Sequence, residues 1–163
     1  MTSRLAIRQL YQLQTLNPLY ELCDSMLLPA EIESKTLIPA LRAILAKKLA
    51  EDHSIREDEI SKMLGVTQAA ISNYIRGTRG DPSLIAKLLA EKQVSTLINE
   101  LTDNLSSDMA YTPSSLSKFI GLCNYIKSSL LICEIHHNLE SNIDEKVCKE
   151  CENMLLKGPG SVY

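Results

Sequence analysis

The chain has 163 residues, 45% of them hydrophobic and 23% charged, and a formal net charge of −3 at pH 7, a composition that fits a globular protein and argues against disorder. An aromatic content of 4% without tryptophan disfavours an all-β sandwich or barrel, so we expect an all-α fold. No apolar run reaches the roughly 18 residues that cross a bilayer, and Arg8 interrupts the N-terminus before a signal-peptide core forms. We therefore expect a cytoplasmic protein without membrane association.

Residues 1–30 are predicted to form an N-terminal helical extension. Leucines recur there at approximately helical spacing: Leu5, Leu10, Leu13 and Leu16. Asn17 and Pro18 then indicate a stop and a new start, because Asn caps helices and Pro is tolerated at the first helical position. A second short helix is expected from Pro18 to Leu28.

Residues 31–106 are predicted to form a helical DNA-binding domain. Its helices are expected over residues 39–53, 56–64, 68–76, 82–93 and 94–106. Pro and Gly mark most of the boundaries, since Pro39 and Pro82 can start helices and Gly65 and Gly77 can end them.

The two helices on either side of Gly65 carry the pattern of a helix-turn-helix. A tight turn needs the left-handed backbone that glycine adopts without a Cβ clash, and Thr67 is a suitable N-cap for the second helix. Ser61 is small where the second helix has to approach the first. The shared core is expected to contain Ile60, Leu64, Val66, Ile71 and Ile75.

The outer face of the second helix is expected to enter the major groove of double-stranded DNA. Gln and Asn can pair with N6 and N7 of adenine, and an Ala methyl can contact the thymine methyl, while Arg and Thr can reach phosphates. The residues predicted to contact DNA are Thr67, Gln68, Ala69, Ser72, Asn73, Arg76, Thr78 and Arg79. Residues 67–80 contain two arginines and no acid, so this patch is locally basic on an acidic chain.

The stretch 55–77 resembles the helix-turn-helix of the XRE family of phage repressor-like regulators. The resemblance spans roughly residues 37–93 and implies a lambda-repressor-like domain in which the helix starting at Thr67 recognises DNA. The base-contacting positions of the family are occupied here by Gln68, Ala69 and Asn73. Glu57 departs from the family pattern, because a glutamine usually contacts phosphate there, and we expect that contact to be weakened or moved to Arg56.

Residues 107–163 are predicted to form a long helix and a cysteine-rich tail. The helix is expected to start at Pro113 and to carry an apolar stripe of heptad spacing: Leu116, Phe119, Cys123, Ile126, Leu130, Cys133 and His137. Such a stripe is typical of a seam between two helices, within one chain or between two. We expect its part from Leu116 to Leu130 to form the contact of a homodimer, and a further helix over residues 144–156.

The cysteines of the tail, Cys133, Cys148 and Cys151, are candidate metal ligands. The Cys-x2-Cys spacing of the last two lets both thiolates converge on one ion or cluster. His136 would complete a Cys3His zinc set, three thiolates can hold an iron–sulfur cluster, and reduced thiols without metal are a third alternative. Cys123 would lie about 15 Å from Cys133 along a continuous helix, too far to share a small cluster, and is expected in the core.

The order of the stretches 29–32, 37–49 and 64–72 and of a cysteine-bearing C-terminus is similar to that of a group of archaeal XRE-type regulators. Members often carry cysteine where Ala30 and Ile120 stand, which reduces the expected ligands here to Cys133, Cys148 and Cys151. The resemblance implies an iron–sulfur cluster of the 3Fe–4S or 4Fe–4S type, with zinc as the alternative.

These features predict a dimeric, sequence-specific transcriptional regulator that senses redox state or iron through its cluster. A homodimer is expected because one recognition helix reads too few base pairs for specificity. The alternatives are a zinc-stabilised DNA-binding protein without a sensing role, and an adaptor or antitoxin that holds a protein partner with the same helices. An enzyme is not expected, because no set of nucleophile, base and orienting residue can be placed and no phosphate-binding glycine loop is present.

Overall fold

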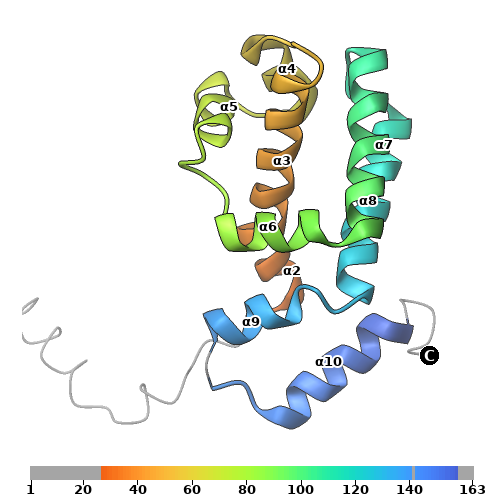
Figure 1. Ribbon diagram of the computed structural model, residues 1–163. Helices are drawn as coiled ribbons and strands as arrows, with labels where there is room; N and C mark the ends of the chain where they lie inside the picture. The colour runs from red at the N-terminus through yellow and green to blue at the C-terminus, as the bar shows by residue number, and fades with distance from the viewer. Residues whose placement is uncertain (1–26, 141, 158–163) are drawn as a thin grey trace, which may run out of the picture.

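The computed structural model describes residues 27–140 and 142–157, and all of its regular elements are helices (Figure 1). The prediction of an all-α fold is therefore confirmed for this part of the chain. The helices predicted between Arg4 and Leu28 lie outside the described residues except for Leu27 and Leu28, which are not helical. Within the described ranges, no helix combines the length and the hydropathy that crossing a membrane requires.

The first described helix passes through a proline. It consists of α2 (Pro29–Ile32), a π-helical segment (Glu33–Leu37) and α3 (Ile38–Glu51), which follow one another without a break. The prediction that Pro39 starts the helix is wrong. Proline inside an α-helix lacks its N–H and collides with a carbonyl of the preceding turn. The wider π turn, in which the N–H of Ile38 bonds the carbonyl of Glu33, gives the ring room.

Helices α4 (Glu57–Leu64) and α5 (Gln68–Ile75) pack against α3 and against each other. Both lie within one residue of their predicted bounds. In Figure 1, α3 stands between α5 on one side and α7 with α8 on the other, so α5 forms an outer face of the molecule.

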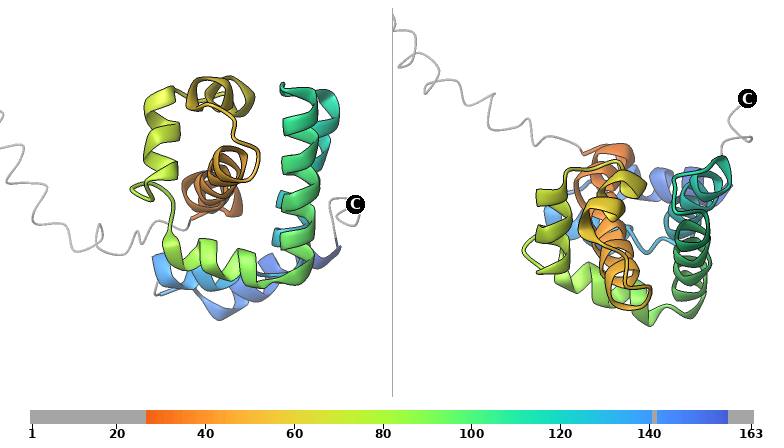
Figure 2. Two further views of the ribbon diagram at one scale, coloured as in Figure 1. Left: turned by 45° about the horizontal axis from the view of Figure 1, so that its top comes forward. Right: turned by 90° about the horizontal axis from the view of Figure 1, so that it is seen from above.

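Helices α6 (Pro82–Ala90) and α7 (Lys92–Asp108) continue the chain from α5 to the far side of α3 (Figures 1 and 2). Asp81 caps α6, since its carboxylate accepts a hydrogen bond from the N–H of Leu84 at 2.9 Å. The two helices meet at Glu91 rather than at the predicted boundary of 93 and 94. Helix α7 runs to Asp108, two residues beyond its predicted end at 106.

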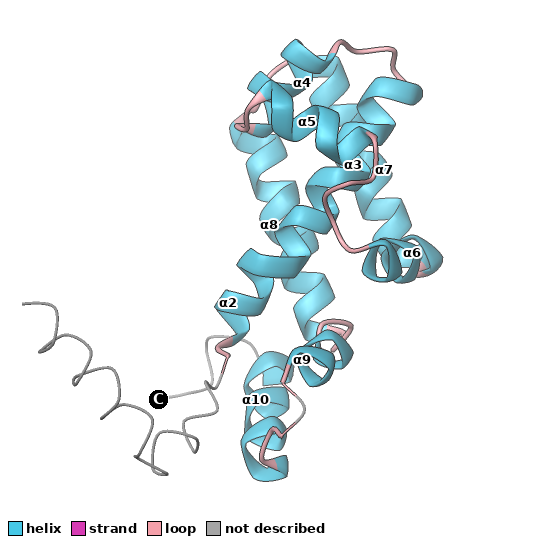
Figure 3. Cartoon of the chain, turned by 90° about the vertical axis from the view of Figure 1, so that its left-hand side faces the viewer, coloured by secondary structure: helices cyan, strands magenta, loops and turns pink. Residues whose placement is uncertain are grey.

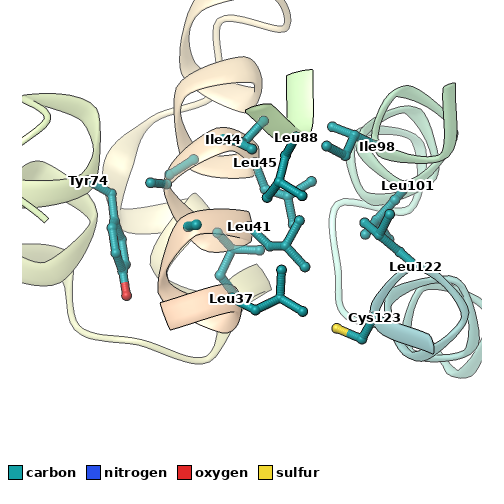
Figure 4. Close-up of a cluster of buried hydrophobic side chains, with 14 of the residues drawn as sticks. Leu37, Leu41, Ile44, Leu45, Tyr74, Leu88, Ile98, Leu101, Leu122 and Cys123 are labelled. Atoms are coloured by element: carbon teal, nitrogen blue, oxygen red, sulfur yellow. The ribbon is translucent and has the colours of Figure 1, made fainter. Parts of the chain in front are cut away.

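The core lies between α3 and the pair of α7 with α8 (Pro113–Ser128). Figure 4 shows side chains from these helices facing one another, among them Leu37, Leu41, Leu45, Ile98, Leu101 and Leu122, all of them fully buried. The sulfur of Cys123 points from α8 toward the side chains of the first helix (Figure 4), and the residue is 4% exposed. The prediction of Cys123 as a core residue is confirmed.

The long helix predicted from Pro113 to His137 is wrong, because the chain breaks it into α8 and α9 (Cys133–Leu139). Leu130 has φ +59° in the turn between them. The turn contains no glycine, although a left-handed backbone conformation costs any other residue about 1–2 kcal/mol. The break brings Ile132 into the core, where it is 3% exposed. This burial is a physical reason for the break, and it cannot be read from the local sequence.

The heptad stripe is therefore not the continuous dimer seam that its spacing predicts. Cys123 and Ile126 are buried within the chain, where α8 packs along α7, whereas Leu116 is 42% exposed. At the C-terminus, α10 (Glu145–Lys157) matches the predicted helix over 144–156. Figure 3 shows α9 and α10 at one end of the molecule and α4 at the other.

Candidate functional site

The turn between α4 and α5 has the geometry that its sequence predicts. Gly65 has φ +63° and ψ +37°, and the N–H of Val66 bonds the carbonyl of Ser61 at 3.1 Å. Thr67 caps α5, because its hydroxyl accepts a hydrogen bond from the N–H of Ala70 at 3.2 Å. Turn and cap together fix the direction in which α5 leaves α4.

The inner face of this motif is packed against α3. Of the predicted core residues, Ile60, Leu64 and Ile71 are buried and Val66 and Ile75 are half-buried. The sequence analysis missed three further buried residues: Met63, Ala70 and Tyr74. Helical spacing would have found Tyr74, which follows Ile71 by one turn.

The outer face of α5 is accessible at its N-terminal end. Thr67, Gln68 and Ala69 are exposed, while Ser72 and Asn73, one turn later, are half-buried. The structure thus brings the predicted DNA-contacting residues to one side of α5 but leaves them unequally accessible. Gln68 is the more open of the two amide side chains.

Asn73 anchors the C-terminal end of α5, a role that the sequence analysis missed. Its Oδ1 accepts hydrogen bonds from Nη2 of Arg76 at 3.1 Å and from the hydroxyl of Thr78 at 3.3 Å. Its backbone carbonyl accepts from the N–H of Thr78 at 3.0 Å. Asn73 therefore ties the exposed residues Arg76 and Thr78 to the helix end.

The second arginine of the patch, Arg79, lies over an aromatic ring. Its guanidinium carbon is 5.1 Å from the ring centroid of Tyr74, within the range of a cation–π interaction. Tyr74 is 2% exposed, so a core side chain holds the exposed Arg79 beside the end of α5. At the start of α4, Nε of Arg56 lies 3.1 Å from Oδ1 of Asp58. Arg56 is the residue expected to contact phosphate in place of the glutamine that Glu57 replaces, and this ion pair partly neutralises its charge.

The cysteines of the tail lie on α9 and α10, which contact each other at His137 and Cys148. The Sγ of Cys148 is 3.3 Å from Nε2 of His137. Burial raises the pKa of Cys133 to about 11, and the neighbouring thiols of Cys151 and Cys148 contribute to that increase. All three predicted ligands are thus near enough to influence one another electrostatically.

The histidine expected to complete a zinc set is directed elsewhere. Nε2 of His136 lies 3.0 Å from Oε2 of Glu140, and it is His137 that contacts Cys148. Across residues 27–140 and 142–157, no group of three or more His, Cys, Asp or Glu side chains is arranged to hold a metal ion. Binding by the three thiols would require their side chains to turn toward a common point.

No protein-family model matches the chain, and neither a curated protein nor a solved structure shows significant similarity to it.

Proposed function

We propose that this protein is a sequence-specific transcriptional regulator that inserts the outer face of α5 into the major groove of DNA, in the manner of an XRE-type, lambda-repressor-like domain. One observation carries the proposal: α5 is held on its buried side by α3 and α4, while Thr67, Gln68 and Ala69 on its other side are exposed. A rigidly supported helix with an open polar face is what major-groove reading requires.

The contacts of α5 assign different roles to its two amides. Gln68 is exposed and is the main base reader in this proposal, because both ends of its amide can meet N6 and N7 of adenine. Asn73 already uses Oδ1 to hold Arg76 and Thr78. It reads a base only when Arg76 leaves that oxygen for a phosphate, so its contribution is coupled to that of the arginine.

The proposed regulator acts as a homodimer, since paired recognition helices read two half-sites. The N-terminal half of α8 supplies the proposed contact in place of the longer predicted seam. Leu116 and Ile120, one turn apart, are 42% and 50% exposed. This contact is smaller than the stripe from Leu116 to Leu130 because Cys123 and Ile126 are buried in the chain and Leu130 is half-buried.

Selection from randomised duplexes about three helical turns long tests DNA reading without a known operator. The full chain is compared with Gln68→Ala and with the matched control Gln93→Ala, which removes an exposed glutamine of α7. The full chain and the control should enrich one common half-site, repeated about 10 base pairs apart or at a multiple of that spacing. Enrichment of no motif, or of the same motif to the same degree by Gln68→Ala, would overturn the proposal.

We propose further that Cys133, Cys148 and Cys151 bind an iron–sulfur cluster of the 3Fe–4S or 4Fe–4S type, with zinc as the alternative. Thiolates suit both, and His137, in contact with Cys148, is the nearer fourth donor for zinc. A bound cluster would supply one-electron chemistry, and the thiols would hold it where α9 meets α10. The side chains must first converge, because no preformed metal-binding group exists in the described part of the chain.

Iron, sulfide and zinc analysis of protein purified without oxygen, together with its visible absorbance, tests this assignment. Iron and sulfide with a visible band support the cluster, and zinc without colour supports the alternative. Cys148→Ser should lower the bound metal content in either case. If the metal content, the absorbance and the DNA affinity of Cys148→Ser all equal those of the full chain, neither the centre nor its link to DNA binding exists.

A further inference from the structure

An apolar groove lies between the start of α2, the C-terminal half of α8 and α10. Its volume is about 950 Å³, and its apolar walls include Leu28, Pro29, Tyr125, Val147, Met154 and Leu155. Three of these side chains are largely exposed: Leu28 at 52%, Val147 at 43% and Met154 at 53%. Contiguous apolar surface of this kind marks a place where another element binds.

Two of the charged side chains on the groove, Lys127 and His136, are paired, and Glu150 also lines it. Nζ of Lys127 lies 2.9 Å from Oε2 of Glu33, and Nε2 of His136 lies 3.0 Å from Oε2 of Glu140. An occupant would therefore be recognised mainly through apolar contacts. The volume also lies at the upper end of the range of small-molecule pockets, about 300–1,000 Å³, which favours a peptide segment over a small polar ligand.

The chain itself enters the described structure at the edge of this groove. Leu27 and Leu28 both line it, and the N–H of Leu27 donates a hydrogen bond to Oε2 of Glu140 at 3.0 Å. Residues 1–26 are thus tethered at the groove. A short tether gives a segment an effective local concentration of the order of millimolar, which favours it over a free partner of equal intrinsic affinity.

The sequence that precedes Leu27 is rich in leucine, as expected of a segment that binds an apolar groove. Residues 4–22 contain leucines at positions 5, 10, 13, 16, 19 and 22. The helically spaced part, residues 4–16, is as long as α10, which has 13 residues. Its length and its apolar character therefore both match the exposed wall that α10 provides.

We propose that the leucine-bearing segment 4–22 of the same chain occupies this groove and covers the exposed side chains of α10. The segment would bury Val147 and Met154 and would hold α10 against α8. This assignment does not depend on DNA binding by α5 and can fail or succeed independently of it. The groove is also lined by Cys148 and Cys151, so it adjoins the proposed metal site.

Trypsin cleavage after Arg4 and Arg8 in the full chain reports whether the segment is bound. The groove variant, Val147→Asp/Met154→Asp, places charge in the groove without changing a core residue. The matched control is Leu89→Asp/Met109→Asp, whose residues are 40% and 50% exposed and do not line the groove. The groove variant should be cleaved at both sites about tenfold faster than the full chain, because cleavage follows the released fraction. The control should be cleaved at the rate of the full chain.

A second pair of variants changes residues of the segment instead of residues of the groove. Leu10→Ser/Leu13→Ser/Leu16→Ser should bind an apolar fluorescent dye several-fold more strongly than the full chain, whereas Gln9→Ser/Gln12→Ser/Gln14→Ser should not. Equal cleavage rates in all variants together with equal dye binding would overturn the proposal. Protection that disappears on dilution would also overturn it, because the groove would then be covered by a second copy of the chain.

Discussion

Nη2 of Arg76 donates a hydrogen bond to Oδ1 of Asn73 at 3.1 Å, so an asparagine on the proposed DNA-contacting face is also a structural anchor. The hydroxyl of Thr78 donates to the same oxygen at 3.3 Å. A single side chain thus supports the end of α5 and belongs to the proposed DNA-contacting face. These two roles can be separated by the choice of substitution.

Asn73→Asp should retain the fold and lose DNA affinity. Aspartate keeps an acceptor for Arg76 and Thr78, so the free energy of unfolding should stay within about 0.5 kcal/mol of that of the full chain. The same carboxylate repels phosphates and cannot donate to adenine N7, which should weaken binding by about 1–3 kcal/mol. Asn73→Ala should lose stability as well, by about 1 kcal/mol. Denaturant unfolding and fluorescence anisotropy with a selected duplex measure the two effects, and unchanged affinity in Asn73→Asp would remove Asn73 from the interface.

Gly65→Ala should destabilise the protein by about 1–2 kcal/mol, because φ is +63° there and a Cβ is disfavoured in that region even though open space surrounds it. Gly121 offers the matched control. It lies inside α8 and a Cβ would also meet no atom within 4 Å, but its backbone is helical, so Gly121→Ala should stabilise by about 0.5–1 kcal/mol. In urea unfolding, the two substitutions should change the free energy of unfolding in opposite directions. A change in the same direction would contradict the left-handed conformation of Gly65.

Tyr74→Phe should raise the free energy of unfolding by about 1 kcal/mol. The hydroxyl of Tyr74 is buried and finds no hydrogen-bond partner among the described residues, so its removal relieves a desolvation penalty. The ring that lies beneath Arg79 is retained. Thermal unfolding measures the change, and a loss of stability above about 1 kcal/mol would show that the hydroxyl has a partner.

The elements of this fold that were predicted correctly are those bounded by residues that act locally. Gly65 and Thr67 define the turn between α4 and α5 through their own backbone and side-chain preferences. Thr112 with Pro113 starts α8 in the same way, since the N–H of Ser115 donates to the hydroxyl of Thr112 at 3.3 Å. The break at Leu130 was missed because tertiary burial of Ile132 determines it. The passage of a helix through Pro39 was missed because only a π turn makes it feasible.

The same distinction applies to the candidate site. Helical periodicity was sufficient to place Gln68 on the outer face of α5, where it is exposed. The anchoring role of Asn73 depends on how the chain turns after α5, which periodicity does not specify. The choice between His136 and His137 beside Cys148 depends on how α9 is rotated relative to α10, and spacing within one helix cannot determine that.

Cys123 should make the protein less stable at alkaline pH. Burial, reinforced by the nearby Glu33, raises the pKa of its thiol from 9.0 to about 12. The native state therefore keeps a proton that the unfolded chain releases, so the contribution to stability is complete below about pH 9 and is lost as the pH rises toward 12. The free energy of unfolding should fall less steeply above pH 9 in Cys123→Ala, the difference in slope being at most about 1.4 kcal/mol per pH unit. If the free energy of unfolding fell equally steeply with pH in the full chain and in Cys123→Ala, the thiol would not be shielded from solvent.

The most direct measurement of the central claim is the affinity of Gln68→Ala for the selected duplex, by fluorescence anisotropy, beside that of Gln93→Ala. Loss of a base-reading amide should weaken binding by about 1–3 kcal/mol, or about 5- to 150-fold, with little change on an unrelated duplex of the same length. Gln93→Ala should bind as the full chain does. Equal affinity of both variants for the selected duplex would contradict the assignment of α5 as the DNA-reading helix.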